Sequence, residues 1–242
     1  GSSAGGEQPK FTATIESGPG VRAVIVKFSE RAGTPAAERW ADLLRCEHLA
    51  GEILHAHGIV AAESELLEAD GRVFLQSTRF DRTAAPGRRG QVSLAALDAA
   101  FYGHGRIDWW KFAPQLQRDG WIDADDARAL AVRGWFGALI GNSDMHLGNA
   151  SLVLADGRPL ALAPSYDMLP MALRPASTGE VVTRILDLPL PLPEQQAHWR
   201  GALPMALDFW RQATDHAGIS SGFRRIASEQ ADKLAAVARR FD

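Results

Sequence analysis

The chain has 242 residues, of which 46% are hydrophobic and 23% charged, and its formal net charge is −3. This length can bury a substantial core in one domain or two packed lobes. The slight negative charge gives no overall electrostatic case for nucleic-acid binding. The single cysteine, Cys46, excludes an internal disulfide and a cysteine-based zinc site. No apolar run reaches the roughly 18 to 20 residues that span a bilayer, so we expect a cytoplasmic protein without membrane contact.

The first part of the chain predicts strands around one helix. Residues 11–15 and 21–28 are rich in β-branched residues, and the Glu-Ser-Gly-Pro-Gly between them is typical of a turn, which predicts a hairpin. Thr34-Pro35 then provides an N-cap followed by proline at the first helical position. We expect this helix to continue to about His57 and to end at Gly58.

The next part changes from strand patterns to helix patterns. Residues 66–80 predict a second hairpin that turns at Asp70-Gly71. Residues 83–91 are rich in Pro, Gly and Arg and are expected to be a connector at a lobe boundary. Helical patterns follow at residues 94–101 and, after Asp123 as N-cap, at residues 124–140.

The remaining elements complete an α+β prediction. Residues 152–154 and 160–162 flank Asp-Gly and indicate a third hairpin, and from Glu194 onward the pattern is mostly helical. A strand-rich first part and a helix-rich second part favour two lobes with a cleft between them. We therefore predict a strand-rich lobe of residues 1–82 and a helical lobe of residues 83–242.

Polar side chains gather directly after the helix that is predicted to end near Gly141. They form the pattern Asp144-x-x-x-x-Asn149, and Asp167 follows the third predicted hairpin. One carboxylate could accept the proton of an attacking hydroxyl, while an amide and a second carboxylate hold Mg²⁺ on phosphates, and the spacing matches a kinase catalytic loop. A polar turn is the structural alternative, and Asp144 with His146 could be metal ligands or an acid/base pair of a hydrolase. We interpret His146 as an orienting residue.

Two further segments supply what ATP chemistry requires. Lys27 ends an apolar strand, where kinases place the ammonium group that binds the α- and β-phosphates. Such a lysine needs a carboxylate from the following helix, and both Glu47 and Glu52 lie there. Gly5 and Gly6 could let backbone amides approach phosphate oxygens closely. Taken singly, these residues are equally explained by a solvated lysine, surface charges and an expression-derived terminus.

Taken in chain order, five segments resemble the HipA-like serine/threonine kinases, the toxins of bacterial toxin–antitoxin modules. Residues 2–10 look like the glycine-rich loop of one branch of that family, and Val26-Lys27 looks like its ATP-binding strand. Arg79-Phe80-Asp81-Arg82 is similar to the segment after its interlobe hinge. Gly141-Asn142-x-Asp144-x-His146-x-x-Asn149 and Ala163-Pro164-x-Tyr166-Asp167 are similar to its catalytic and metal-binding motifs. The resemblance covers nearly the whole chain.

The resemblance implies a bilobal protein-kinase-like fold and the use of ATP and Mg²⁺. It also implies that one serine of the glycine-rich loop can be autophosphorylated. The added phosphate would then inactivate the enzyme, because it competes with the ATP phosphates for the same cationic groups. The implied roles are Asp144 as catalytic base with Lys27 and His146 beside it; Gly5, Gly6, Lys27, Glu47, Thr78, Phe80 and Tyr166 at the nucleotide; Asn149 and Asp167 at the metal; and Ser2 or Ser3 as the autophosphorylated residue.

We therefore expect an ATP-dependent serine/threonine protein kinase that is the toxin of a toxin–antitoxin system. Its expected partners are ATP, a protein substrate for which the family suggests an aminoacyl-tRNA synthetase, and an antitoxin through which alone it would contact DNA. We also expect the chain to lack the region that precedes the glycine-rich loop in the family. Two alternatives stay open: a non-catalytic module that binds nucleotide or antitoxin, and a small-molecule phosphotransferase on the same fold.

Overall fold

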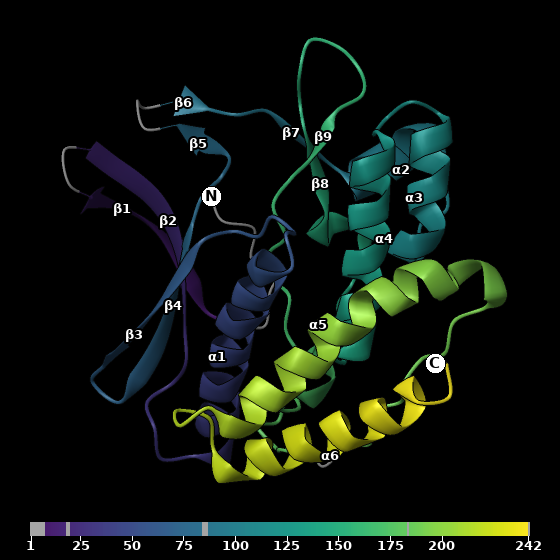
Figure 1. Cartoon of the computed structure of the whole chain (residues 1–242). Helices are drawn as coiled ribbons and strands as arrows, with labels where there is room; N and C mark the ends of the chain where they lie inside the picture. The colour runs from purple at the N-terminus through teal and green to yellow at the C-terminus, as the bar shows by residue number, and fades with distance from the viewer. Residues whose placement is uncertain (1–7, 18–19, 84–86, 183, 242) are drawn as a thin grey trace.

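The computed structural model describes residues 8–17, 20–83, 87–182 and 184–241, and it shows an α+β fold with a strand-rich side and a helical side (Figure 1). The strand-rich side is one antiparallel four-stranded sheet in the order β1-β2-β4-β3. Helix α1 lies between this sheet and the helices of the second side (Figure 1). The elements of the first side are β1 (Lys10–Ser17), β2 (Gly20–Phe28), α1 (Pro35–Ala56), β3 (Ser64–Ala69) and β4 (Arg72–Thr78).

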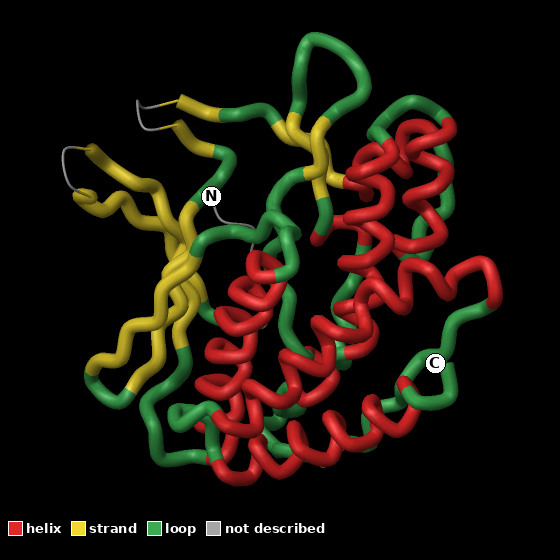
Figure 2. Tube along the Cα trace, viewed as in Figure 1, coloured by secondary structure: helices red, strands yellow, loops and turns green. Residues whose placement is uncertain are grey.

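Five further helices and two small sheets follow within the described residues (Figure 2). The pair β5 (Arg82–Thr83) and β6 (Gly87–Arg88) lies near the four-stranded sheet (Figure 1). The helical side holds the short strands β7 (Gln91–Ser93), β8 (Ser151–Val153) and β9 (Ala161–Leu162). Its helices are α2 (Leu94–Phe101), α3 (Trp109–Arg118), α4 (Ala124–Leu139), α5 (Gln196–Asp215) and α6 (Ser221–Ala238). Single 3-10 turns lie at η1 (Leu147–Asn149), η2 (Met171–Leu173) and η3 (Pro193–Gln195).

Helix α1 joins the two sides because it is buried on two faces. The Thr34 side chain accepts a hydrogen bond from the Ala37 amide at 3.1 Å, which caps the helix as predicted. Gly58 follows the helix with φ of 75°, a backbone conformation that glycine adopts at no steric cost. Leu44 packs with the sheet, whereas Leu43 belongs to the core of the helical side. The position of α1 therefore fixes the sheet relative to the helices.

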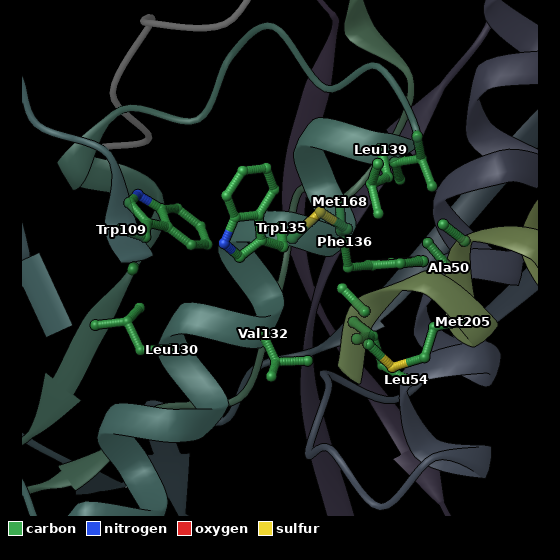
Figure 3. Close-up of a cluster of buried hydrophobic side chains, with 14 of the residues drawn as sticks. Ala50, Leu54, Trp109, Leu130, Val132, Trp135, Phe136, Leu139, Met168 and Met205 are labelled. Atoms are coloured by element: carbon green, nitrogen blue, oxygen red, sulfur yellow. The ribbon is translucent and has the colours of Figure 1, made fainter. Parts of the chain in front are cut away.

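The main core is built around α4 (Figure 3). Trp135 and Phe136 are at most 2% exposed, and they contact a continuous cluster that includes Leu54 of α1 and Met205 of α5. Full burial of such a side chain contributes about 1.5 to 3 kcal/mol. Met168 belongs to the same cluster, so the segment that carries Asp167 is anchored to the core.

Most of the predicted elements are confirmed, and two regions differ from the prediction. The three hairpins and the helices at residues 94–101 and 124–140 are present. Helix α3 was not predicted, because Pro114 in its interior and two adjacent tryptophans obscure the helical pattern. The connector at residues 83–91 holds short strands, of which β7 pairs with β8. The division of the chain at residue 82 stays a prediction.

Candidate functional site

Lys27 lies where three segments that are distant in the chain meet. It stands in β2, the strand between β1 and β4, and only 10% of its side chain is exposed. Its ammonium group donates hydrogen bonds to both carboxylate oxygens of Glu47 on α1, at 2.6 and 2.7 Å. It also contacts the carboxylate of Asp167. The fold thus places one cation between two carboxylates, one from each side of the molecule.

Lys27 attracts both carboxylates of this cluster, Glu47 and Asp167, while the two carboxylates repel each other. Burial alone would lower the pKa of Lys27, but the charges of Asp167 and Glu47 outweigh it, so the pKa is raised above the usual range. Burial raises the pKa of Glu47 more than the attraction of Lys27 lowers it. Burial also opposes ionisation of Asp167, yet Lys27 holds the pKa of this carboxyl below its usual value. Lys27 is therefore charged, and Asp167 is its ionised partner.

The backbone around Asp167 is held in an uncommon conformation. Asp167 has φ of 54°, in the left-handed region, which costs a non-glycine residue of order 1 kcal/mol. Its carbonyl accepts a hydrogen bond from the Asn142 side chain at 3.2 Å, so the catalytic loop supports the turn. Residues held in such conformations by their surroundings cluster at functional sites.

Arg133 fixes the segment that leads to Asp167, and the sequence patterns did not single it out. This residue of α4 is 5% exposed and donates hydrogen bonds to the carbonyls of Ala163, at 2.6 Å, and Val60, at 3.0 Å. Burial lowers its pKa to about 10. It thereby joins the loop after α1 to the segment before Asp167. The only signal in the sequence is an arginine within the apolar stretch of α4.

The loop of residues 141–149 presents Asp144 to solvent while its backbone is held from both sides. The Asn142 side chain accepts a hydrogen bond from the Asp144 amide at 3.0 Å, and the Asn149 side chain donates one to the Asp144 carbonyl at 2.8 Å. The Asp144 side chain is 55% exposed, and the nearest His146 ring nitrogen is 4.0 Å away. The His146 ring also accepts a hydrogen bond from the Gly148 amide. The loop is therefore ordered, with a carboxylate available to an incoming group.

Asn149 and Asp167 have the donor atoms that Mg²⁺ prefers. Asn149 uses its amide nitrogen on the Asp144 carbonyl, which leaves its side-chain oxygen for a cation. In the part of the chain that the structure describes, no cluster of three or more His, Cys, Asp or Glu side chains could hold a metal. Mg²⁺ commonly keeps several waters and takes one or two protein ligands plus substrate phosphates. Asn149 and Asp167 thus fit a Mg²⁺ ion whose other ligands are phosphate oxygens and water.

A cavity of about 240 Å³ extends from the Lys27 cluster to residues 78–81, which we call the hinge segment. Thr78 and Phe80 line it, together with Tyr166 from the segment before Asp167. The Phe80 and Tyr166 rings lie 5.6 Å apart, and the Tyr166 hydroxyl donates to the Gly148 carbonyl at 3.0 Å. The cavity thus has a charged end and an aromatic end, as a nucleotide requires.

Glu52, the other carboxylate considered for Lys27, does not line this cavity. Glu52 is exposed, and its nearest basic neighbour is His48, at 3.6 Å, so the structure selects Glu47 as the partner of Lys27. The predictions for the glycine-rich loop fall on residues outside those that the structure describes: Ser2, Ser3, Gly5 and Gly6.

A lysine–glutamate pair under a sheet, a hinge segment and an Asp-x-x-x-x-Asn loop define a kinase-like fold. Two solved structures share it, each with a TM-score of 0.60. One is HipA of Shewanella oneidensis MR-1, in complex with HipB and operator DNA, which is 16% identical and covers 98% of this chain and 64% of its own. The other is CtkA, a proinflammatory kinase of Helicobacter pylori, which is 12% identical and covers 93% of this chain and 87% of its own. At these identities the similarity shows the fold alone.

The chain belongs to the family of HipA-like C-terminal domains, which matches residues 2–239. The expected branch of the family is also found: Toxin YjjJ of Escherichia coli (strain K12) is 39% identical over 235 residues. That alignment covers 97% of this chain and 53% of the relative. The chain thus spans about half the length of its curated relative, so the activity of the longer protein is a matter for proposal here. Among the described residues, no helix is long and apolar enough to cross a membrane.

Proposed function

We propose that this chain is a HipA-like serine/threonine kinase that transfers the γ-phosphoryl group of ATP to a protein hydroxyl. One observation carries the proposal: Lys27 is held between Glu47 and Asp167 at the charged end of the 240 Å³ cavity. The catalytic loop adjoins this cluster through the hydrogen bond from Asn142 to the Asp167 carbonyl. A buried ion cluster of this kind is costly to desolvate, and a role in binding phosphates accounts for that cost.

The transfer step follows from the positions of these side chains. The acceptor hydroxyl oxygen attacks the γ-phosphorus while its proton passes to the Asp144 carboxylate. A new oxygen–phosphorus bond forms, the bond to the β-phosphate oxygen breaks, and ADP leaves with that electron pair. Lys27 binds the phosphates, and Asn149 holds the backbone of Asp144 in place. Catalysis then consists mainly of positioning and charge neutralisation.

Mg²⁺ would be held by the side-chain oxygen of Asn149 and the carboxylate of Asp167. When bound, it would neutralise charge on the β- and γ-phosphates. Since Asp167 already contacts Lys27, the same carboxylate can serve both the ammonium group and the ion.

The biological setting is proposed by analogy with the relatives. Toxin YjjJ is named as a toxin, and HipA of Shewanella oneidensis is seen with HipB and operator DNA. We propose that this chain acts in the cytoplasm as part of a toxin–antitoxin system and contacts DNA only through an antitoxin. An aminoacyl-tRNA synthetase is the substrate class that the family suggests.

The test is Asp144→Asn, with Asp156→Asn as control because Asp156 is exposed in the β8–β9 turn. We expect Asp144→Asn to abolish transfer of phosphate from radiolabelled ATP to proteins of a cell extract, whereas the control transfers like the wild type. ATP with Mg²⁺ should still stabilise Asp144→Asn in a thermal-shift assay, by about 2.7 kcal/mol at a hundred times Kd. Undiminished transfer by Asp144→Asn would remove Asp144 as the base. If metabolites are labelled in place of proteins, the chain is a small-molecule phosphotransferase. If it binds ATP but transfers no phosphate, it is a non-catalytic module.

A further inference from the structure

A second cavity, of about 590 Å³, lies against the catalytic loop. It is lined by residues 105–110 at the start of α3, by Ala138 of α4 and by residues 142–147 of the loop. It shares no lining residue with the cavity at Lys27. Asp144 belongs to this second cavity, and the Asn142 that lines it donates to the Asp167 carbonyl of the first. The catalytic loop therefore lines the second cavity and is hydrogen-bonded to the backbone of a residue that lines the first, so two substrates could approach Asp144 and Lys27 from different cavities.

One wall of the second cavity is a fixed aromatic surface. The half-buried Trp110 ring stacks on Trp135, with ring centroids 4.3 Å apart and an angle of 20° between the rings. Glycine at position 134 permits this approach, since a Cβ atom there would lie 3.1 Å from Trp109 Cβ and 3.1 Å from Trp110 Cε3. Such a held ring can bury an apolar side chain of a partner with little loss of conformational entropy.

The cavity also carries a cation without a partner. Arg106 is exposed, and its side chain forms no ion pair or hydrogen bond within the described residues. Asp108, the acidic residue nearest to it in sequence, is paired with Lys111 at 2.7 Å. Within the described residues, Arg106 therefore has no ion-pair partner, although Asp108 and Asp144 line the same cavity. A negatively charged group on the occupant would complement it.

We infer that this cavity binds the acceptor: a protein segment whose serine or threonine hydroxyl reaches Asp144 and whose neighbouring acidic side chain pairs with Arg106. An apolar side chain of the segment packs on Trp110. A chain segment fits better than an enclosed metabolite, because Arg106, Asp144 and His146 at the lining are exposed and the cavity is open to solvent beside them. This inference rests on the proposed kinase function, and it adds the charge and shape of the substrate.

The experiment measures phosphate transfer from radiolabelled ATP to libraries of peptides with one fixed serine or threonine. We expect wild-type protein to label peptides with Asp or Glu near the acceptor faster than peptides with Lys or Arg. Arg106→Glu should lose about fivefold to tenfold of its rate on acidic peptides through a higher KM for peptide, with the KM for ATP unchanged. Arg225→Glu, which reverses an exposed charge on α6, is the control. Trp110→Ala should raise the peptide KM for all sequences.

The outcomes separate the cavity from the kinase function. If wild type labels peptides but Arg106→Glu keeps the same preference and KM, the acceptor site lies elsewhere and the kinase function stands. If wild type releases ADP from ATP but labels no peptide, the inferred occupant is wrong while phosphate transfer is retained. If wild type neither releases ADP nor labels any peptide, the proposed function fails and the inference falls with it. A preference for acidic peptides that Arg106→Glu reverses supports the site.

Discussion

The two halves of the candidate site differ in burial and in how their charges are balanced. The side chains of Lys27 and Glu47 are 10% and 9% exposed, and Lys27 donates hydrogen bonds to the Glu47 carboxylate. The side chains of Asp144 and His146 are 55% and 60% exposed, and the Asp144 Oδ1 and His146 Nε2 atoms lie 4.0 Å apart. One half is therefore a closed ion cluster inside the fold, and the other is an open polar loop.

This difference in burial suits the proposed roles of the two halves, which are to bind phosphates and to receive an acceptor hydroxyl. Phosphates have fixed shape and charge, so a cation that is already positioned and desolvated can bind them without reorganisation. An acceptor hydroxyl arrives on a larger partner, so its carboxylate has to be reachable from solvent. The scaffold supports both halves through Arg133 and Asn142, which hold the segments before and at Asp167. Substitutions in the buried half should therefore affect stability and nucleotide binding, and those in the loop region should affect turnover.

Lys27→Met should have the largest combined effect. It leaves the carboxylates of Glu47 and Asp167 together without their shared ammonium group, and removal of one partner from a buried ion pair costs about 3 kcal/mol. We expect urea unfolding to show this loss and ATP with Mg²⁺ to give no thermal shift. Lys233→Met, at an exposed lysine of α6, should leave both measurements unchanged. An ATP-dependent shift of normal size in Lys27→Met would show that the buried cluster is structural only.

Gly137→Ala should affect turnover more than nucleotide binding. A Cβ atom at this position of α4 would lie 2.8 Å from Met145 Cε and 3.0 Å from Met168 Sδ. These methionines directly follow Asp144 and Asp167, and the ends of their side chains have to repack within the core to make room. We expect part of that adjustment to reach the two carboxylates. Misplacement of a catalytic group by about 1 Å can lower the rate by about a hundredfold.

The measurement for Gly137→Ala is kcat for phosphate transfer beside the Kd for ATP. Gly222→Ala on α6, where no atom lies within 4 Å of the added Cβ, is the control and should keep the wild-type rate. Met145→Ala combined with Gly137→Ala removes the nearest clash and should restore part of the rate. Full activity in Gly137→Ala alone would mean that the loop adapts freely, contrary to the ordered backbone around Asp144.

Local signals in the sequence predicted much of the fold, because they act over a few residues. Thr34 and Asp123 cap their helices as expected. The spacing Asp144-x-x-x-x-Asn149 predicts a catalytic loop, and its role stays a prediction. The partner of Lys27 could not be chosen in this way. Glu47 and Glu52 differ by about 140° around a helix with 100° per residue, and only the packing of α1 decides which one faces the sheet.

The residues that depend on tertiary packing were missed for the same reason. Arg133 acts through carbonyls at positions 60 and 163, far from it in the chain, so no local pattern marks its role. The cavity beside Asp144 requires α3, whose helical pattern is interrupted by Pro114. Its cation, Arg106, lies in an unremarkable loop sequence. Long-range contacts thus determine where the side chains of the candidate site lie and which residues line the cavity beside Asp144. The side chains that we propose to react are visible in short sequence motifs.

Glu52→Gln should have the smallest effect and gives the sharpest check on the buried half. Glu52 is on the same helix as Glu47, but 64% of its side chain is exposed and its neighbour is His48. An exposed pair of this kind contributes at most about 1 kcal/mol, so Kd for ATP should stay within about twofold of the wild type. Glu47→Gln, which alters the residue that faces Lys27, should weaken ATP binding clearly more. Equal effects of the two substitutions would mean that the negative charge of α1 as a whole matters and that the contact between Lys27 and Glu47 has no special role.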